Sequence, residues 1–133
     1  MNANSLDDRA REQLNQVTEK IIGAAYTVLN ELGCGFLEKV YENALSHELR
    51  KQGIVASQQP ELLVHYDGIV VGVYRPDILV GSAIIVDIKT VRAIGDAELA
   101  QVLNYLKSTG LRIALVLNFS KPKLEIKRVA RNF

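Results

Sequence analysis

Two charged side chains at the end of one apolar segment carry the clearest chemical signal in the sequence. Asp87 and Lys89 stand two residues apart at the end of residues 83–89, which are otherwise apolar. Side chains of a strand alternate between its two faces, so Asp87 and Lys89 project to the same side. Burying a charge is costly unless the charge is paired or holds a metal ion. The pattern therefore indicates either an ion pair at a strand end or a charged functional site.

A third charged residue, Asp77, favours the functional site. Asp77 follows Pro76 at the start of the preceding segment, and a short loop at Gly81 folds that segment back onto the next one. Two carboxylates that lie close together repel each other, which suggests that a positive group lies between them. Lys89 meets this need in part. A divalent cation meets it better, because Mg²⁺ prefers one or two carboxylates together with water molecules.

The length of the loop between the two segments decides whether the two aspartates meet. A two-residue loop would place Asp77 opposite Val86, on the wrong face of the sheet. A three-residue loop, residues 81–83, would place it opposite Asp87. Loops of three residues usually contain a glycine with positive φ, and Gly81 is available for that position. If the aspartates share a site, we therefore expect the longer loop or a β-bulge.

Polar side chains on two predicted helices are further candidates. Glu38 and Tyr41 are three residues apart, and Gln101 and Tyr105 are four apart, so the members of each pair share a helix face. Each pair alone is a weak signal. A helical glutamate is usually solvated, and a tyrosine at helical spacing usually belongs to the core.

Hydrophobic periodicity and turn signals predict the elements that position these residues. We predict helices over residues 7–32, 37–52 and 96–108, and strands over residues 61–66, 69–75, 77–80, 83–89, 111–118 and 124–130. The predicted buried face of the second helix consists of Leu37, Val40, Ala44, Leu45 and Leu49. Asp67-Gly68 between two apolar runs predicts a hairpin. The strand over 83–89 is nearly all apolar and should be central, whereas the last strand should be an edge. This order predicts an α/β (α+β) fold in one domain, residues 1–133, with helices on a mixed sheet.

Composition narrows the class of protein. The chain of 133 residues is 48% hydrophobic and 23% charged, with a formal net charge of +1, which is typical of a globular domain. No apolar stretch approaches the roughly 20 residues of a membrane span, and residues 1–8 do not resemble a secretory signal. The single cysteine, Cys34, excludes an internal disulfide and a zinc site with several cysteines. We expect a cytoplasmic protein that does not bind membranes.

The basic residues near the C-terminus allow two interpretations. Residues 121–133 contain five lysines and arginines against the single acidic residue Glu125. A charged edge strand that keeps the protein soluble explains them as well as a surface that faces phosphates does.

The candidate residues also carry a resemblance to a known family. Pro76-Asp77 followed by Asp87-Ile88-Lys89 resembles the PD-(D/E)xK pattern of the restriction-endonuclease-like nuclease superfamily. Residues 35–41, Gly-Phe-Leu-Glu-Lys-Val-Tyr, resemble the signature of the GxxExxY protein family, a small branch of that superfamily. Residues 100–106 and 117–119 resemble its helix motif and its following strand. The similarity covers about residues 17–129, and the motifs occur in the right order. The chain has Asp87 where glutamate is common in the family, and the superfamily pattern permits either residue.

The resemblance implies a fold, an activity and roles for the candidate residues. It implies a restriction-endonuclease-like core with a hairpin-rich mixed sheet, and a nuclease that hydrolyses phosphodiester bonds of DNA or RNA with Mg²⁺ or Mn²⁺. Asp77, Asp87 and the carbonyl of Ile88 would bind the metal, and Glu38 would be a further ligand, directly or through water. Lys89 would activate the attacking water or stabilise charge on phosphorus. Gln101 and Tyr105 would orient Lys89, the water or a phosphate oxygen.

Three functions remain open at this point. The first is a metal-dependent nuclease, which the complete set of candidate residues favours. The second is a nucleic-acid-binding module without activity, and the third is a protein-interaction domain with an incidental acidic pocket. A fold alone does not establish an activity. By analogy with small nucleases of the superfamily, a homodimer is also expected.

Overall fold

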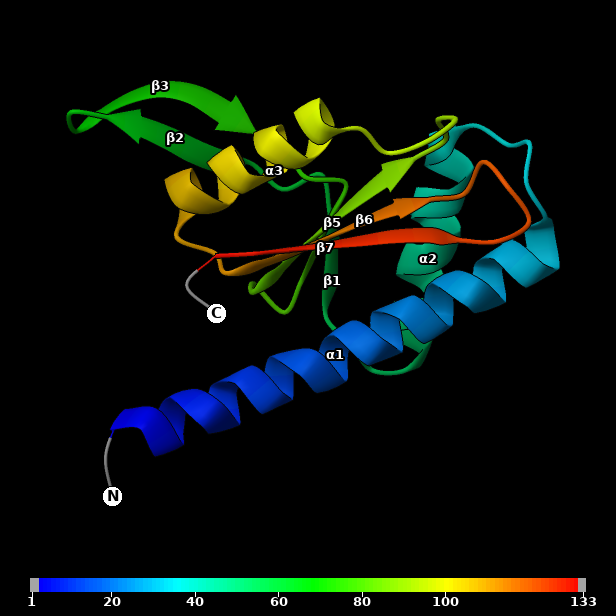
Figure 1. Ribbon diagram of the computed structural model, residues 1–133, viewed down its shortest axis with the longest axis horizontal. Coiled ribbons are helices and arrows are strands. Elements are labelled where there is room, and N and C mark those ends of the chain that lie inside the picture. Colours follow the sequence, from blue (N-terminus) through cyan, green and yellow to red (C-terminus); the bar gives the residue numbers. More distant parts are fainter. Residues whose placement is uncertain (1–2, 132–133) are drawn as a thin grey trace.

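The computed structural model describes residues 3–131 and has a mixed sheet with helices on both faces (Figure 1). The helices are α1 (Ala3–Leu32), α2 (Glu38–Lys51) and α3 (Asp96–Thr109). The strands are β1 (Ala56–Gln58), β2 (Leu62–Tyr66), β3 (Ile69–Tyr74), β4 (Ile78–Val80), β5 (Ile84–Lys89), β6 (Ile113–Asn118) and β7 (Glu125–Ala130). The predicted fold class is confirmed. The predicted helices and strands are present with ends shifted by at most four residues, and β1 is an additional strand that the sequence did not predict.

The main sheet has five strands in the order β1-β4-β5-β6-β7, so β5 is central and β7 is an edge, as predicted. Only β5 and β6 are parallel, and α3 forms the crossover between them. A parallel pair needs such a crossover because its second strand must start again from the same end of the sheet. The carboxyl ends of β5 and β6 therefore meet at one end of the sheet, and the loops after these strands lie together there (Figure 1).

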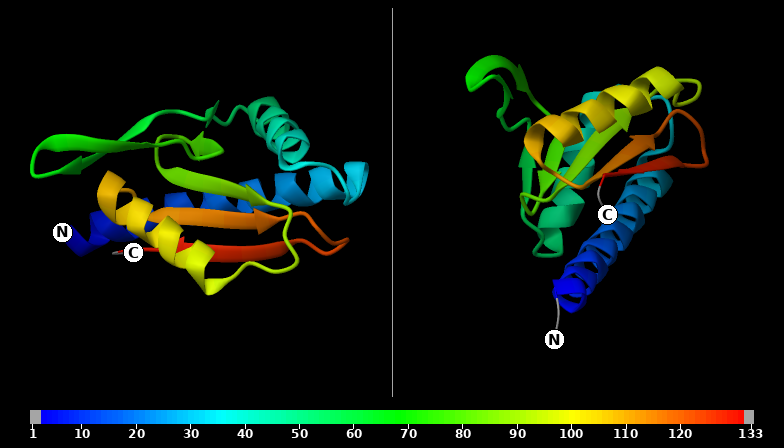
Figure 2. Two further views of the ribbon diagram at one scale, coloured as in Figure 1. Left: turned by 90° about the horizontal axis from the view of Figure 1, so that it is seen from above. Right: turned by 60° about the vertical axis from the view of Figure 1, so that its left-hand side comes forward.

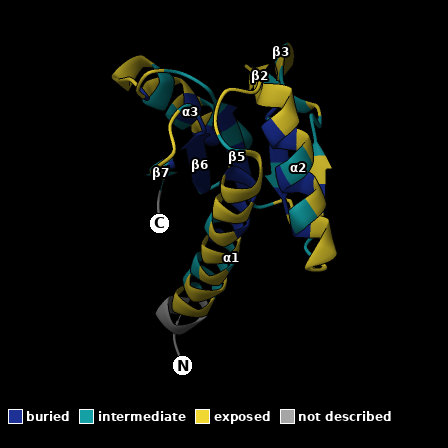
Figure 3. Cartoon of the chain, turned by 90° about the vertical axis from the view of Figure 1, so that its right-hand side faces the viewer, coloured by how far each residue is buried: buried dark blue, intermediate teal, exposed yellow. Residues whose placement is uncertain are grey.

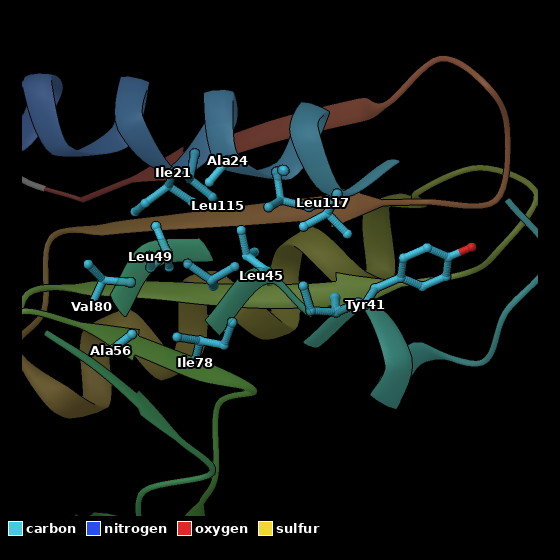
Figure 4. Packing of buried hydrophobic residues seen from close by; sticks show 14 of the residues in the cluster. Ile21, Ala24, Tyr41, Leu45, Leu49, Ala56, Ile78, Val80, Leu115 and Leu117 are labelled. Atoms are coloured by element: carbon cyan, nitrogen blue, oxygen red, sulfur yellow. The ribbon is translucent and has the colours of Figure 1, made fainter. Parts of the chain in front are cut away.

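Helices α1 and α2 cover one face of the sheet and α3 covers the other (Figure 2). Alternate residues of β5 divide between two cores. Ile84, Val86 and Ile88 pack with α1 and α2, whereas Ile85 packs with Val102 and Leu106 of α3. The first core, shown in Figure 4, is the larger and includes Tyr41 at its end. Asp87 and Lys89 have the same parity as Ile85, so they face α3.

Helix α1 is only partly covered. Its buried residues begin at Thr18, and residues 7–17 are exposed or half-buried (Figure 3). No helix among residues 3–131 is long and apolar enough to cross a membrane.

The predicted buried face of α2 is confirmed at Leu45 and Leu49 and is wrong at Leu37 and Val40. Leu37 is 81% exposed and Val40 is 38% exposed, whereas Tyr41 and Glu42 are buried. The complete buried set is Tyr41, Glu42, Leu45, Ser46 and Leu49. Two of these residues, Glu42 and Ser46, are polar, so a search for apolar spacing could not find them.

The β2–β3 hairpin turns at Asp67-Gly68, as predicted, with positive φ at both residues. The hairpin does not join the main sheet. It forms a separate two-stranded sheet that extends beyond the body of the protein beside α3 (Figures 1 and 2). Ile69, Val71 and Val73 of β3 are all more than 40% exposed. The hairpin was predicted from the sequence, whereas its separation from the mixed sheet was not.

Candidate active site

The turn between β4 and β5 sets the register that brings the two aspartates together. Val80 pairs with Ile84, and Ile78 pairs with Val86, so the loop has three residues, as the hypothesis of a shared site required. The Ala83 N–H donates to the Val80 carbonyl at 3.0 Å, and Gly81 and Ser82 both have positive φ, at 59° and 56°. Extending the pairing by one residue places Asp77 opposite Asp87.

Asp77 is held at the strand end by two donors. Its Oδ2 accepts a hydrogen bond from the Ile88 N–H at 2.6 Å, and its Oδ1 accepts one from Gln59 Nε2 at 3.2 Å. In a strand, the backbone N–H and the carbonyl of one residue point toward the same side of that strand. The Ile88 carbonyl therefore faces the edge where the Asp77 carboxylate lies, while the Ile88 side chain is buried in the core.

A chain of hydrogen bonds connects Asp77 to helix α2. Gln59 Nε2 also donates to Glu42 Oε1 at 2.9 Å, and the backbone N–H of Gln59 donates to the Asp77 carbonyl at 3.0 Å. Glu42 is 3% exposed, and its other oxygen accepts from Gln58 and Lys39 at 2.7 and 2.9 Å. An ionised carboxylate needs this many donors to be stable in the interior. Glu42 and Gln59 thus fix Asp77 through contacts that link three elements.

Sequence reasoning did not identify Glu42 or Gln59. The signal for Glu42 was a charged residue directly after Tyr41 and three before Leu45, inside what proved to be the buried face of α2. No local signal marked Gln59, which adopts a positive φ of 53° between β1 and Pro60.

Asp87, Lys89 and Asp77 line a cavity of about 180 Å³ beneath α3. Lys89 Nζ lies 3.4 Å from Asp87 Oδ2, and both side chains are about one-quarter exposed or less. The remaining polar or aromatic lining comes from Gln101 and Tyr105 of α3, from Tyr74 at the end of β3 and from Arg75, which is paired with Glu61. The structure therefore brings together five of the predicted site residues in one half-buried cavity, Asp77, Asp87, Lys89, Gln101 and Tyr105.

The aromatic side of this cavity is a stacked pair. The rings of Tyr74 and Tyr105 lie 3.7 Å apart between centroids and are within 5° of parallel. The contact fastens the base of the hairpin to α3. Burial and then the charges of Asp87 and Asp77 raise the pKa of the Tyr74 phenol, so this residue is a neutral hydrogen-bonding group in the cavity.

The Asp87 carboxyl is poised to lose its proton near neutral pH. Burial is the main reason that its pKa is raised to about 7; the charge of Lys89 opposes this effect, and the charge and hydrogen bond of Asp77 add to it. Of the two basic residues that line the cavity, Arg75 is paired with Glu61, which leaves the Lys89 ammonium to face the two carboxyl groups. A hard divalent cation fits this donor set, because it accepts one or two carboxylates and a carbonyl and removes the repulsion between them.

Glu38 lies at the margin of this arrangement. Its Oε2 accepts a hydrogen bond from the Thr90 N–H at 3.1 Å, just beyond the end of β5. Glu38 does not line the cavity, and residues 3–131 contain no cluster of three or more His, Cys, Asp or Glu side chains that could hold a metal. The structure therefore does not bring Glu38 into direct contact with the pair of aspartates. Its helical neighbour Tyr41 belongs to the core, where it stacks on Phe119 with centroids 4.6 Å apart.

Comparison with known proteins identifies a family and a fold. The model of the PD-(D/E)XK nuclease superfamily matches residues 15–129. A search of curated proteins found no match. Two solved structures share the fold. The alkaline exonuclease LHK-Exo from Laribacter hongkongensis is 14% identical with a TM-score of 0.52, over 71% of this chain and 56% of that one. The protein SSO0001 is 18% identical with a TM-score of 0.53, over 94% of this chain and 63% of that one. This chain thus spans less than two thirds of either structure.

Proposed function

We propose that this chain, which belongs to the PD-(D/E)XK nuclease superfamily, is a metal-dependent nuclease that hydrolyses phosphodiester bonds of DNA or RNA. The observation that carries the proposal is the pairing that sets Asp77 opposite Asp87, with Lys89 in the same cavity. We assign the chain to the GxxExxY branch on residues 35–41. As in other small nucleases, a homodimer is the arrangement that we propose for acting on two strands.

Asp77, Asp87 and the Ile88 carbonyl are the groups that would hold Mg²⁺ or Mn²⁺, and Glu38 would contribute through water. When bound, such an ion lowers the pKa of a water molecule and stabilises negative charge on phosphoryl oxygens. The Ile88 N–H and Gln59 fix the Asp77 carboxylate before substrate arrives. Asp87 binds its proton weakly enough near pH 7 to exchange it for a cation.

Lys89 is the group that meets the phosphate. Its ammonium lies 3.4 Å from the Asp87 carboxylate, and it shares the cavity with Asp77, Gln101 and Tyr105. A positive charge held there stabilises the negative charge that develops as water attacks phosphorus. The Gln101 amide and the Tyr105 hydroxyl can orient Lys89, the water or a phosphate oxygen by hydrogen bonds.

Calorimetric titration of Mg²⁺ or Mn²⁺, together with a cleavage assay on single-stranded DNA, duplex DNA and RNA, tests the proposal. We expect wild type to bind the metal and to cleave at least one substrate, and Asp77→Asn/Asp87→Asn to do neither. The matched control, Asp67→Asn/Asp96→Asn, removes the same number of carboxylates from exposed positions and should behave like wild type.

A second pair of variants isolates the role of Lys89. Lys89→Gln should keep metal binding and lose cleavage by about 100- to 1,000-fold, the usual effect of removing one group that stabilises transition-state charge. Lys107→Gln, on the exposed side of α3, is the control. Metal binding without cleavage in wild type would favour the inactive nucleic-acid-binding module. Full activity of the double aspartate variant would disprove the assigned site.

A further inference from the structure

A second cavity, of about 280 Å³, lies at the carboxyl ends of β5 and β6. The loop after β5 contributes Arg92, and the loop after β6 contributes Lys121 and Lys123. Its inner wall includes Asn118 at the end of β6 and Glu125 at the start of β7. Three cationic side chains from two loops thus surround one cavity in a protein whose net charge is only +1.

Buried hydrogen bonds hold the two loops in a fixed relation. Asn118 is 3% exposed, and its side chain donates to the Val91 carbonyl at 2.8 Å and to Glu125 Oε1 at 2.9 Å. Its Oδ1 accepts from the N–H groups of Val91 and Ser120 at 3.1 and 3.2 Å. Glu125 Oε1 also accepts from the Ile94 N–H at 3.0 Å. The cavity is therefore built on a rigid frame rather than on free loops.

The frame leaves the three cationic groups available to a ligand. Among the described residues, the side chains of Arg92, Lys121 and Lys123 take part in no hydrogen bond or ion pair, although Glu125 lines the same cavity. The Glu125 carboxylate is directed instead to Asn118 and to the Ile94 N–H, which lower its pKa and keep it ionised. One negative charge faces three positive ones, so the cavity has a net positive charge and suits an anion.

This cavity adjoins the candidate active site. Lys89 and Asn118 are register partners on the parallel strands β5 and β6, so their side chains project to the same face. Neighbouring strands lie about 4.8 Å apart. Lys89 lines the first cavity and Asn118 the second, and only Thr90 and Val91 separate Lys89 from Arg92 along the chain. Figure 1 shows both loops at the end of the sheet where β5 and β6 terminate.

We infer that Arg92, Lys121 and Lys123 form a subsite that binds a phosphate of a nucleic-acid strand next to the phosphate being hydrolysed. The inference rests on the proposed nuclease function for its substrate. The inference also gives different roles to the basic residues near the C-terminus. Lys121 and Lys123 belong to the subsite, whereas Arg128 on β7 donates to Asn15 of α1 at 2.6 Å.

Binding measurements with two charge-matched variants test the subsite. One variant is Arg92→Gln/Lys121→Gln/Lys123→Gln. The control, Arg9→Gln/Lys20→Gln/Lys107→Gln, removes one arginine and two lysines from exposed positions elsewhere, so both variants have the same net charge. Fluorescence anisotropy of a labelled single-stranded oligonucleotide is followed in EDTA over a range of salt concentrations. Thermal unfolding of each variant verifies that it is folded.

We expect the subsite variant to bind at least fivefold more weakly than wild type and the control to bind as wild type does. Each lost phosphate contact corresponds to about fivefold near 0.1 M salt and reduces the slope of log K against log[salt] by about 0.7. Oligonucleotides with and without a 5′-phosphate distinguish the source of the phosphate. If the subsite variant loses the same affinity for both oligonucleotides, the subsite binds an internal phosphate. If it loses affinity only for the 5′-phosphorylated oligonucleotide, the subsite binds the terminal phosphate.

Equal weakening of both variants would overturn the inference, because net charge alone would then explain binding. No weakening of the subsite variant, or no binding by wild type at low salt, would overturn it as well. Cleavage by wild type is measured separately. If the subsite variant binds the oligonucleotide more weakly but wild type does not cleave, only the nuclease proposal is contradicted. If wild type cleaves but the subsite variant binds as tightly as wild type, only the subsite is contradicted.

Discussion

Replacing Asp87 by asparagine should change how the stability of the protein depends on pH. The pKa of the Asp87 carboxyl rises from 3.8 to about 7 on folding, chiefly through burial. Below about pH 4 the group is protonated in both states and has no effect. Between about pH 4 and pH 7 the unfolded chain loses the proton that the native protein keeps, so stability falls as the pH rises. Above the folded pKa the loss is complete.

The expected magnitude follows from these two pKa values. Between about pH 5 and pH 8, Asp87 should lower the free energy of unfolding of wild type by roughly 2–3 kcal/mol. The asparagine side chain cannot ionise, so Asp87→Asn should gain that amount relative to wild type over the same interval. Groups that do not interact with Asp87 cancel in the difference, and the effects of Asp77 and Lys89 on Asp87 are already contained in its pKa.

Urea unfolding followed by circular dichroism, in EDTA at the two pH values, measures this difference. With equal m-values, the change appears as a shift of the transition midpoint. Asp67→Asn, in the exposed turn of the hairpin, is the control and should follow wild type. If Asp87→Asn and wild type have the same pH dependence, or if the difference has the opposite sign, the reasoning about the buried carboxyl is refuted.

Substitutions at three other positions test the contacts that hold the site in place. Gln59→Ala removes a donor from both Glu42 and Asp77 and should lower the free energy of unfolding by about 1–3 kcal/mol. Gln59→Glu should lower it further at neutral pH, and urea titrations should show the difference between the two variants shrinking toward pH 4. Tyr105→Ala should lose about 0.5–1.5 kcal/mol of stacking and accelerate amide exchange in β2 and β3, whereas Tyr105→Phe should not; equal exchange in both variants would contradict this anchor. Ser82→Gly should stabilise the protein by about 1 kcal/mol, because Ser82 adopts a left-handed conformation, and an unchanged melting temperature would argue against that strain.

The parts of the fold that sequence predicts well are those fixed by local rules. Periodic apolar residues define α1, and Asp67-Gly68 defines the hairpin turn. The sequence left the loop before β5 at two or three residues, and the three-residue loop found in the structure is the one that sets Asp77 opposite Asp87. Gln101 and Tyr105 were joined to this site by the family resemblance, and all five residues line one cavity in the structure.

The parts that sequence misses depend on contacts between distant elements. Strand β1 is short and largely polar, and it is a strand only because it pairs with β4. Glu42 is buried because Gln58, Gln59 and Lys39 surround it, which no helical period reveals. The basic cavity depends on Asn118, whose side chain fastens one loop to another. These features are set by tertiary hydrogen bonds rather than by patterning.

The tight turn after β4 also limits how the length of this chain can vary. Surface loops generally tolerate insertions and deletions well, because lengthening a loop costs little entropy. Here one residue more or less would exchange the two faces of β4, sending Asp77 toward the α1–α2 core and Ile78 toward α3. A relative that carried such a change could keep every residue of the site in its sequence and still have no site. Length at residues 81–83, more than identity, is therefore the property to examine when relatives of this chain are aligned.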